Sequence, residues 1–354
     1  MIPRAPDDHC RPLIVPIFIP HAGCPHRCAF CDQNAITGSS VLPTPDVITD
    51  TIRQWRSHSR HRGRPLQIAF YGGNFLGLPK EAVTSMLDAA TAATTAHVLS
   101  GIRFSTRPDT ITASRLAMLE EYPIRMIEVG VQSLNDRVLS ASRRGHDARS
   151  AKAAIQCLIA AGHDFGIQLM VGLPEDTAAA AMATARQVAA MRPGAVRIYP
   201  TLVLRHSALA EWTLRGKYRP WSLTSAVEVV AAMVRVFAQK DIPVIRMGLQ
   251  DDDGLRDDGA VLAGPYHPAF GHLVHSRLFR DALDGELMHR RPLPGIVEVG
   301  VHPRSRSRIG GWRNATLMDL ERRFAVSLQI TPDPGIGVEQ LWVDHHPPVS
   351  VFSG

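Results

Sequence analysis

Three cysteines stand close together in a chain that has only two others. Cys24, Cys28 and Cys31 fall within the stretch HAGCPHRCAFC, with the spacing C-x3-C-x2-C. Thiols pair as disulfides, bind zinc, or hold iron–sulfur clusters. Five cysteines is an odd number, and three so close together cannot all pair locally, so a secreted disulfide framework is not expected. Cysteine usage instead favours a reducing cytoplasm.

Zinc and an iron–sulfur cluster require different ligand sets. Structural zinc sites commonly take four ligands in two separated pairs, and no distant C-x2-C pair completes this motif. His21 and His26 are the nearby candidates for a fourth zinc ligand. Three thiolates on a 4Fe–4S cluster leave one iron open to a substrate or cofactor. Zinc, a cluster and unligated cysteines therefore remain as alternatives, while Cys10 and Cys157 are expected to be an N-terminal thiol and a small buried helix residue.

Composition describes an ordinary globular protein of 354 residues, with 45% hydrophobic residues and a formal net charge of +6. This length suffices for one large α/β domain with an appendage. No apolar run reaches the ~20 residues of a membrane span, so no membrane association is expected. The positive charge suits an anionic partner such as RNA, although scattered arginines are more typical of a solvated surface.

The apolar stretch 12–20, followed by Ala22-Gly23-Cys24, superficially resembles the end of a lipoprotein signal. Three prolines interrupt it, and Asp7 and Asp8 precede it, which does not suit a signal peptide. We therefore expect a strand that leads into the cysteine loop.

Short β-rich runs alternate with Ala-rich helical stretches along the first 250 residues. The expected strands are 13–20, 66–71, 101–106, 126–132, 165–171, 196–202 and 242–249, and the expected helices are 79–99, 113–121, 149–161, 176–191 and 222–240. This alternation predicts βαβ units and a parallel sheet. Residues 251–354 are rich in Pro, His and Arg with little periodicity. We expect a core barrel over 1–250 and, over 251–354, an extension packed on it.

Chemically distinctive residues follow several of these strands. The cysteines follow the first strand, Gly72-Gly73-Asn74 the second, Gln132-Ser133 the fourth, and Gly172-Leu173-Pro174 the fifth. In parallel β/α barrels the loops at the carboxyl ends of the strands share one face, which holds the active site. The sequence therefore predicts one site built from these strand ends.

A C-x3-C-x2-C motif after the first strand of a β/α-repeat chain resembles the signature of the radical SAM superfamily. The resemblance implies a partial (β/α)6 barrel and a 4Fe–4S cluster bound by Cys24, Cys28 and Cys31. Its open iron would hold the amino and carboxylate groups of S-adenosylmethionine (SAM). A reductant such as flavodoxin or ferredoxin would supply the electron that cleaves the sulfonium, and the resulting 5′-deoxyadenosyl radical would take hydrogen from the substrate. The protein then supplies position and exclusion of water.

FYGGNF, residues 70–75, is similar to the Gly-Gly-Glu motif of the superfamily, whose backbone receives the SAM amino group. The similarity implies that role for the backbone of Gly72, Gly73 and Asn74, because glycines allow close approach. Asn74 stands where an acid is usual, so no charge-based role is carried over. Taken alone, a Gly-Gly pair at a strand end is more often simply a turn.

Residues 127–147 resemble the fourth-strand segment of the Elongator catalytic subunit and of oxygen-independent coproporphyrinogen dehydrogenases. This implies that Gln132 and Ser133 line the SAM region and that Arg143 or Arg144 pairs with the SAM carboxylate, a role suited to the planar guanidinium. IQLMVGLPEDT, residues 167–177, similarly implies that Gln168 faces the ribose. The alternatives are a solvated basic turn for the arginines and a satisfied core amide for Gln168.

The residues 197–222 and 241–250 resemble the radical SAM half of Elongator-type proteins, including short bacterial versions. Nothing resembles the acetyltransferase half, so the complete Elongator reaction is not carried over. The resemblance favours a tRNA nucleotide as substrate, with a tetrapyrrole or another small metabolite as the alternative. A non-catalytic cluster or zinc protein that uses the barrel for sensing is the second hypothesis. The histidines of GPYHPAFGHLVH are expected to serve packing, and QDDDG at 250–254 to be a solvated turn.

Overall fold

The computed structural model describes residues 12–20, 22–31, 41–58, 65–93, 99–249, 260–293, 295–311 and 314–353. A curled sheet of seven strands has the order β1-β2-β3-β4-β5-β6-β8, and each strand is parallel to its neighbour. Its strands are β1 (Leu13–Ile19), β2 (Leu66–Gly72), β3 (Leu99–Thr106), β4 (Ile124–Gln132), β5 (Phe165–Val171), β6 (Ala195–Pro200) and β8 (Val244–Met247). This half-barrel confirms the predicted fold class.

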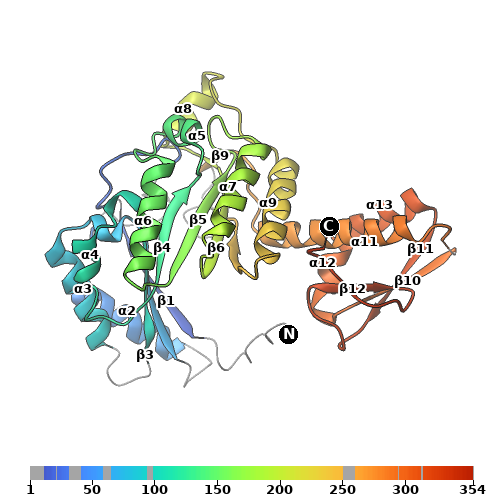
Figure 1. Ribbon diagram of the computed structural model, residues 1–354, viewed down its shortest axis with the longest axis horizontal. Helices are drawn as coiled ribbons and strands as arrows, with labels where there is room; N and C mark the ends of the chain where they lie inside the picture. Colours follow the sequence, from blue (N-terminus) through green and yellow to red (C-terminus); the bar gives the residue numbers. More distant parts are fainter. Residues whose placement is uncertain are drawn as a thin grey trace.

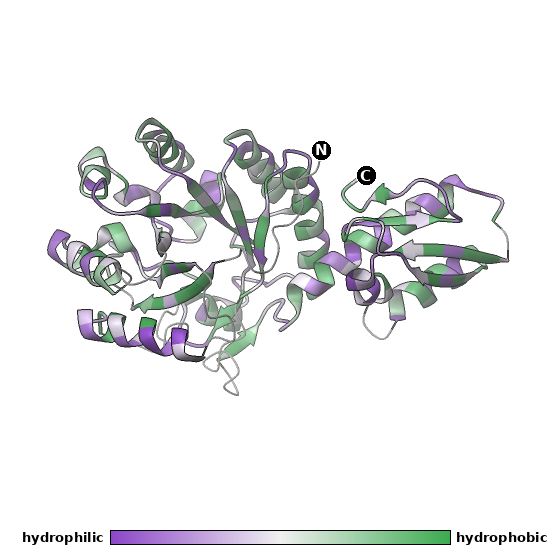
Figure 2. Cartoon of the chain, turned by 90° about the horizontal axis from the view of Figure 1, so that it is seen from below, coloured by the Kyte–Doolittle hydropathy of each residue, from purple (hydrophilic) through white to green (hydrophobic). Residues whose placement is uncertain are grey.

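Helices cover the convex side of the sheet, except that α5 and α8 lie at one end of its strands (Figure 1). They are α2 (Pro45–His58), α3 (Lys80–Ala92), α4 (Ala113–Ala117), α5 (Asp136–Ala141), α6 (Ala148–Ala160), α7 (Ala178–Ala190), α8 (Ala208–Leu214) and α9 (Leu223–Ala238). Side-chain caps begin α4, α5, α6, α7 and α9; in the last three, Asp147 accepts from Ser150 N, Thr177 from Ala180 N, and Ser222 from Ser225 N. Figure 2 shows the strands largely in hydrophobic colours and the helices with hydrophilic turns facing outward.

The strand predictions agree with the structure to within two or three residues at either end. The predicted helix 79–99 is too long, because α3 ends at Ala92 and Leu99 already begins β3. The predicted strand 196–202 ends at Pro200, and a short strand β7 (Val203–Leu204) follows it and pairs with β9 (Val261–Ala263). The helices α2, α5 and α8 were not predicted. Residues 12–20 contain β1, as expected.

Two features of the barrel bear on its surroundings. In the residues that the structure describes, β1 pairs only with β2, so it is an edge strand, and it carries Pro16 at its centre. Proline is tolerated at such an edge because no ladder hydrogen bond is needed on the open side. No helix in the described ranges is both long enough and apolar enough to cross a membrane.

Regular elements also occur after residue 259, where the sequence showed little periodicity. They are α11 (Phe270–His289), β10 (Ile296–Val301), α12 (Arg306–Gly310), α13 (Ala315–Phe324), β11 (Ser327–Pro332), β12 (Gln340–Val343) and β13 (Val349–Ser350). The strands form a separate sheet in the order β11-β10-β12-β13. We call residues 295–353 the C-terminal unit.

Helix α11 joins this unit to the barrel, because it packs against α9 at one side and against α12, α13 and β12 at the other (Figure 1). Phe237 of α9 and Phe279 of α11 belong to one continuous hydrophobic core with Leu320 of α13. The division at residue 250 stays a prediction. Cys10, His21 and residues 250–259, with the predicted acidic turn, lie outside the described residues.

Candidate functional site

A cavity opens at the carboxyl ends of the parallel strands, where the sequence predicted one. Every strand from β1 to β6 contributes to its wall, either from its last residues or from the loop that follows. The predicted site residues that line it are Cys24, Cys28, Cys31, Gly72, Gly73, Gln132, Arg144 and Gln168; Ser105, Thr106, Arg107 and Tyr199 are among the other lining residues.

The cysteine loop is held against two helices of the barrel. Ala29, which is fully buried between Cys28 and Cys31, donates its N–H to Ser142 O at the end of α5 (2.9 Å) and accepts from Leu209 N of α8 (3.0 Å). All three cysteine thiols are free of disulfides. The helices α5 and α8, which the sequence did not predict, therefore fix the position of the loop.

Asn74 is fully buried and ties the cysteine loop to the end of β3. Its side-chain amide donates to Gly23 O at 2.6 Å, and its Oδ1 accepts from Thr106 Oγ1, Thr110 Oγ1 and Arg107 N at 2.7–2.9 Å. Its backbone N–H donates to Ala22 O (3.2 Å). Asn74 does not line the cavity, and it uses both the donor and the acceptor of its amide, which an acid with two acceptors would not reproduce at neutral pH.

The two glycines before Asn74 lie where backbone meets backbone. Gly72 has φ 103°, a conformation that favours glycine. A side chain on Gly73 would meet Pro20 O at 2.5 Å and Ala22 O at 3.0 Å. Packing of β2 against the cysteine loop therefore requires glycine at position 73. This requirement holds whether or not the backbone of Gly73 also contacts a ligand.

Two buried arginines stand beside Cys28. Arg144 Nη1 lies 3.2 Å and Arg107 Nη1 3.7 Å from its Sγ. Arg144 also donates to Gly130 O, and Arg107 donates to Arg144 O, both at 2.6 Å. Arg107 is further held by Asp109 through two hydrogen bonds of 2.8 and 2.9 Å. Both guanidinium groups are therefore placed as hydrogen-bond donors to the sulfur of Cys28.

Burial and the charges of Arg107 and Arg144 shift the pKa values of two neighbouring groups, Cys24 and His146. Burial raises the pKa of the Cys24 thiol, and the charges of Arg107 and Arg144 partly oppose that rise. Burial, with the repulsion of Arg144 and Arg107, lowers the pKa of His146 to about 3. His146 is therefore neutral at physiological pH and adds no charge beside the cysteine loop.

A polar network crosses the barrel interior next to the cavity. Gln168 Nε2 donates to Ser105 Oγ (2.9 Å) and to Glu128 Oε2 (3.0 Å). Glu128 is almost completely buried, and its Oε1 accepts from Arg197 Nη2 at 3.0 Å. The two side chains also form an ion pair, in which Arg197 Nε lies 2.7 Å from Glu128 Oε2. Arg197 in turn donates to Tyr71 Oη at 2.8 Å. Gln168 thus has the partners of a satisfied core amide and also borders the cavity.

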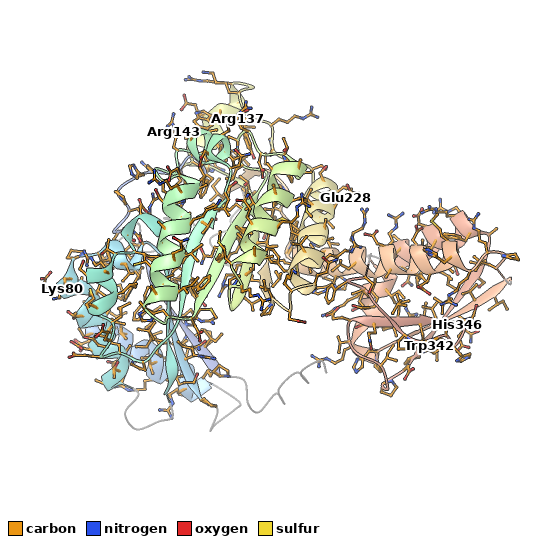
Figure 3. All side chains as sticks on the ribbon, in the orientation of Figure 1. Lys80, Arg137, Arg143, Glu228, Trp342 and His346 are labelled. Carbon is orange, nitrogen blue, oxygen red and sulfur yellow. The ribbon has the colours of Figure 1, made fainter. Side chains whose placement is uncertain are left out.

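Besides Asn74, two predicted residues do not line the cavity. Ser133 is buried beside α7, where its Oγ accepts from Asn135 N (3.2 Å) and lies 3.5 Å from Thr184 Oγ1. Arg143 is exposed at the end of the barrel near α5 and α8 (Figure 3), and its guanidinium stacks over the Trp212 ring at 4.8 Å. Of the two arginines that the sequence left open, only Arg144 borders the cavity.

The sequence missed Arg107 and Glu128 as members of the site. Both carried a readable signal: Arg107 directly follows the third strand, and Glu128 is a lone charge in the apolar run MIEVGV. The histidines expected to serve packing lie elsewhere, near α11. His267 Nδ1 accepts from Ala269 N at 3.0 Å, and His275 Nδ1 lies 3.7 Å from Glu339 Oε2.

The donor chemistry of the cavity suits an iron–sulfur cluster with a bound SAM. Across the described ranges, no group of three or more His, Cys, Asp and Glu side chains is placed to hold a metal ion. A 4Fe–4S cluster needs less convergence, because each thiolate binds a different iron. Among the described residues, the buried Oε1 of Gln132 has no hydrogen-bond partner, and Gln132 borders the same cavity. Such an acceptor is suited to a donor group on a ligand.

Comparison with known proteins agrees with this site. A family model described as the radical SAM superfamily matches residues 18–188, and a model described as the radical SAM C-terminal domain matches residues 193–280. The tRNA uridine(34) acetyltransferase of Dehalococcoides mccartyi is 25% identical over 279 residues, which cover 66% of this chain and 60% of that protein. Elongator complex protein 3 of Mus musculus is 27% identical over 218 residues, covering 52% and 39%.

Among solved structures, the archaeal Elp3 of Methanocaldococcus infernus with an N-terminal deletion has a TM-score of 0.60 at 20% identity, over 76% of this chain and 63% of that one. This likeness supports the barrel fold. The chain spans less than two thirds of the length of each of these three proteins. The two family models together cover most of the barrel and reach into α11, and the chain belongs to the radical SAM superfamily of enzymes.

Proposed function

We propose that this enzyme binds a 4Fe–4S cluster through Cys24, Cys28 and Cys31 and uses it to cleave SAM reductively. The observation that carries the proposal is the placement of three cysteine side chains on one cavity, with two buried guanidinium groups beside Cys28. When bound, the cluster and SAM supply a one-electron cleavage and a 5′-deoxyadenosyl radical that abstracts hydrogen from substrate.

The residues that line the cavity would bind SAM and orient it. Arg144 borders the cavity and offers the planar guanidinium that a carboxylate takes, so we assign to it, rather than to Arg143, the SAM carboxylate. Gly72 and Gly73 present backbone without side chains to the SAM amino group. Gln132 accepts from SAM through its unpartnered Oε1. Gln168, held by Glu128 and Ser105, lies at the ribose.

The proposed substrate is a nucleotide of tRNA. Two of the relatives named above act on tRNA or carry the Elongator name, and the chain has a formal net charge of +6. Because the chain is shorter than those relatives, their complete reactions are not transferred. Retention of tRNA that falls steeply with salt supports this substrate. No retention at low salt, together with SAM cleavage stimulated by a tetrapyrrole, would replace tRNA with a small metabolite.

The first experiment is anaerobic reconstitution with iron and sulfide, followed by reduction, addition of SAM and an assay for 5′-deoxyadenosine. Cys28→Ala is the test variant. Cys157→Ala is the matched control, because Cys157 is a partly buried thiol on α6 that does not line the cavity. We expect product from the wild type and the control, and none from Cys28→Ala. A loaded cluster without product, or zinc in place of iron, would refute the proposal.

A further inference from the structure

The helices and strands of the C-terminal unit follow one another in an order that differs from the β/α alternation of the barrel. Strand β10 leads through a short 3-10 turn at Pro303–Ser305 into α12, which ends at Gly310, and α13 and β11 follow along the chain. β11 lies parallel to β10, and α12 and α13 pack against each other and against α11. The helices lie on one side of the sheet (Figure 1). KH domains combine two helices and a glycine-rich loop in this way, and the loop clamps the backbone of about four nucleotides.

Of the two glycines at the end of α12, the second has a backbone conformation that favours glycine. Gly311 has φ 67° and ψ −168°, which L residues rarely adopt, and a side chain on it would overlap Thr316 Oγ1. A side chain on Gly310 would meet Asn314 Oδ1 at 2.6 Å. The sequence of the turn keeps the first glycine of the G-x-x-G pattern, while its fourth position is Arg313. The proposal below rests on Gly310 and Gly311.

Two exposed arginines accompany this turn. Arg304 and Arg306 lie just before it, and among the described residues no acidic side chain forms an ion pair with either. Arg306 Nη1 lies 3.9 Å from the position that a Cβ on Gly310 would occupy. Arg308, by contrast, pairs with Glu339 at 2.7 Å. Guanidinium groups without a carboxylate partner, close in sequence to two glycines, suit phosphate groups.

We propose that the C-terminal unit binds a single-stranded RNA segment, with its phosphates at the Gly310–Gly311 turn and on Arg304 and Arg306. The inference rests on the proposed function, because the RNA is taken to be the tRNA substrate. The C-terminal unit would bind a segment of that tRNA other than the nucleotide that enters the barrel. Two arginines at one turn fall short of the basic clusters of four to eight residues that bind anionic membranes, so a membrane surface is not favoured.

The test measures RNA binding by the full reconstituted chain between about 50 and 200 mM salt. The probe is a mixed-sequence single-stranded RNA of about ten nucleotides, longer than the four that a KH turn holds. The variant is Arg304→Gln/Arg306→Gln. The matched control is Arg322→Gln/Arg323→Gln, which makes the same change in charge at the far end of α13, about 10 Å along the helix from its first turn.

We expect the test variant to bind the RNA at least about tenfold more weakly at low salt. The slope of log affinity against log salt should fall by about 1.4, because each phosphate contact on a single strand contributes about 0.7. The control should stay within threefold, a shift of about 0.6 kcal/mol. Equal weakening in both variants, no binding by the wild type, or equal binding of a duplex would overturn the proposal. Formation of 5′-deoxyadenosine without RNA, unchanged in both variants, separates this outcome from a failure of the radical chemistry.

Discussion

Replacing Asn74 with aspartate removes one N–H donor at a buried site that uses it. In the wild type the amide donates to Gly23 O at 2.6 Å while Oδ1 accepts three hydrogen bonds. A protonated aspartic acid reproduces this pattern, since its O–H takes the place of the amide donor. An ionised carboxylate instead places a second acceptor against the carbonyl of Gly23. The folded state should therefore raise the pKa of the new carboxyl group.

The size of the effect follows from that preference. Keeping the acid protonated at pH 5, about one unit above its ordinary pKa of about 3.9, costs about 1.5 kcal/mol. At pH 8 the same requirement would cost more than 5 kcal/mol, so the group ionises, and the penalty becomes that of a lost buried hydrogen bond with repulsion, about 3 kcal/mol. A raised pKa gives stability that is present at low pH and is lost as the pH rises.

The assay is urea unfolding of the metal-free protein at pH 5 and pH 8, which does not depend on cluster loading. Asn135→Asp is the control, because Asn135 caps α5 as an acceptor from Arg137 N and Val138 N, a role that aspartate fills equally well. The control should change by less than about 0.5 kcal/mol. A penalty for Asn74→Asp that is equal at both pH values, or larger at pH 5, would refute the assigned donor.

Three other changes test the site. Arg144→Gln should weaken SAM binding by the reconstituted protein at least about tenfold, whereas Arg143→Gln should leave it within twofold, as measured by equilibrium dialysis; similar losses would contradict the choice of Arg144. Glu128→Gln should destabilise the protein by about 3 kcal/mol in urea, because Arg197 keeps a buried charge without its carboxylate; an unchanged midpoint would contradict the network. His146→Gln should reduce the loss of stability between pH 6.5 and 5 by up to about 2 kcal/mol, because the unfolded imidazole takes up a proton there and the folded one, with its pKa lowered to about 3, does not; an identical pH profile would refute this.

The sequence allowed the barrel to be predicted because its strands are buried on both sides. Runs such as that of β5 (Phe165–Val171) are then almost continuously apolar and stand out between helices. Helix α2 was missed although Pro45 and Asp46 in its first turn are a helix-start signal. The C-terminal sheet was missed because β12 and β13 have four and two residues, too few to show a period.

The site was predictable to the extent that it depends on strand order. Cysteines, glycines and Gln132 follow or end strands, and the parallel topology brings them to one cavity. The direction in which a side chain points after the end of a strand depends on tertiary packing. Gln132, with φ 66°, borders the cavity while the next residue, Ser133, turns toward α7, and adjacent Arg143 and Arg144 separate into an exposed and a buried residue. No sequence period distinguishes the members of either pair.

The half-barrel leaves β1 with one side unpaired, and unpaired strands are sites where molecules add to one another. Pro16 lies in the middle of that strand and has no N–H to offer on its open side. A second chain that approached this edge would find its hydrogen-bonding ladder interrupted after a few residues. The same proline therefore disfavours the addition of further strands at this edge and so acts against aggregation.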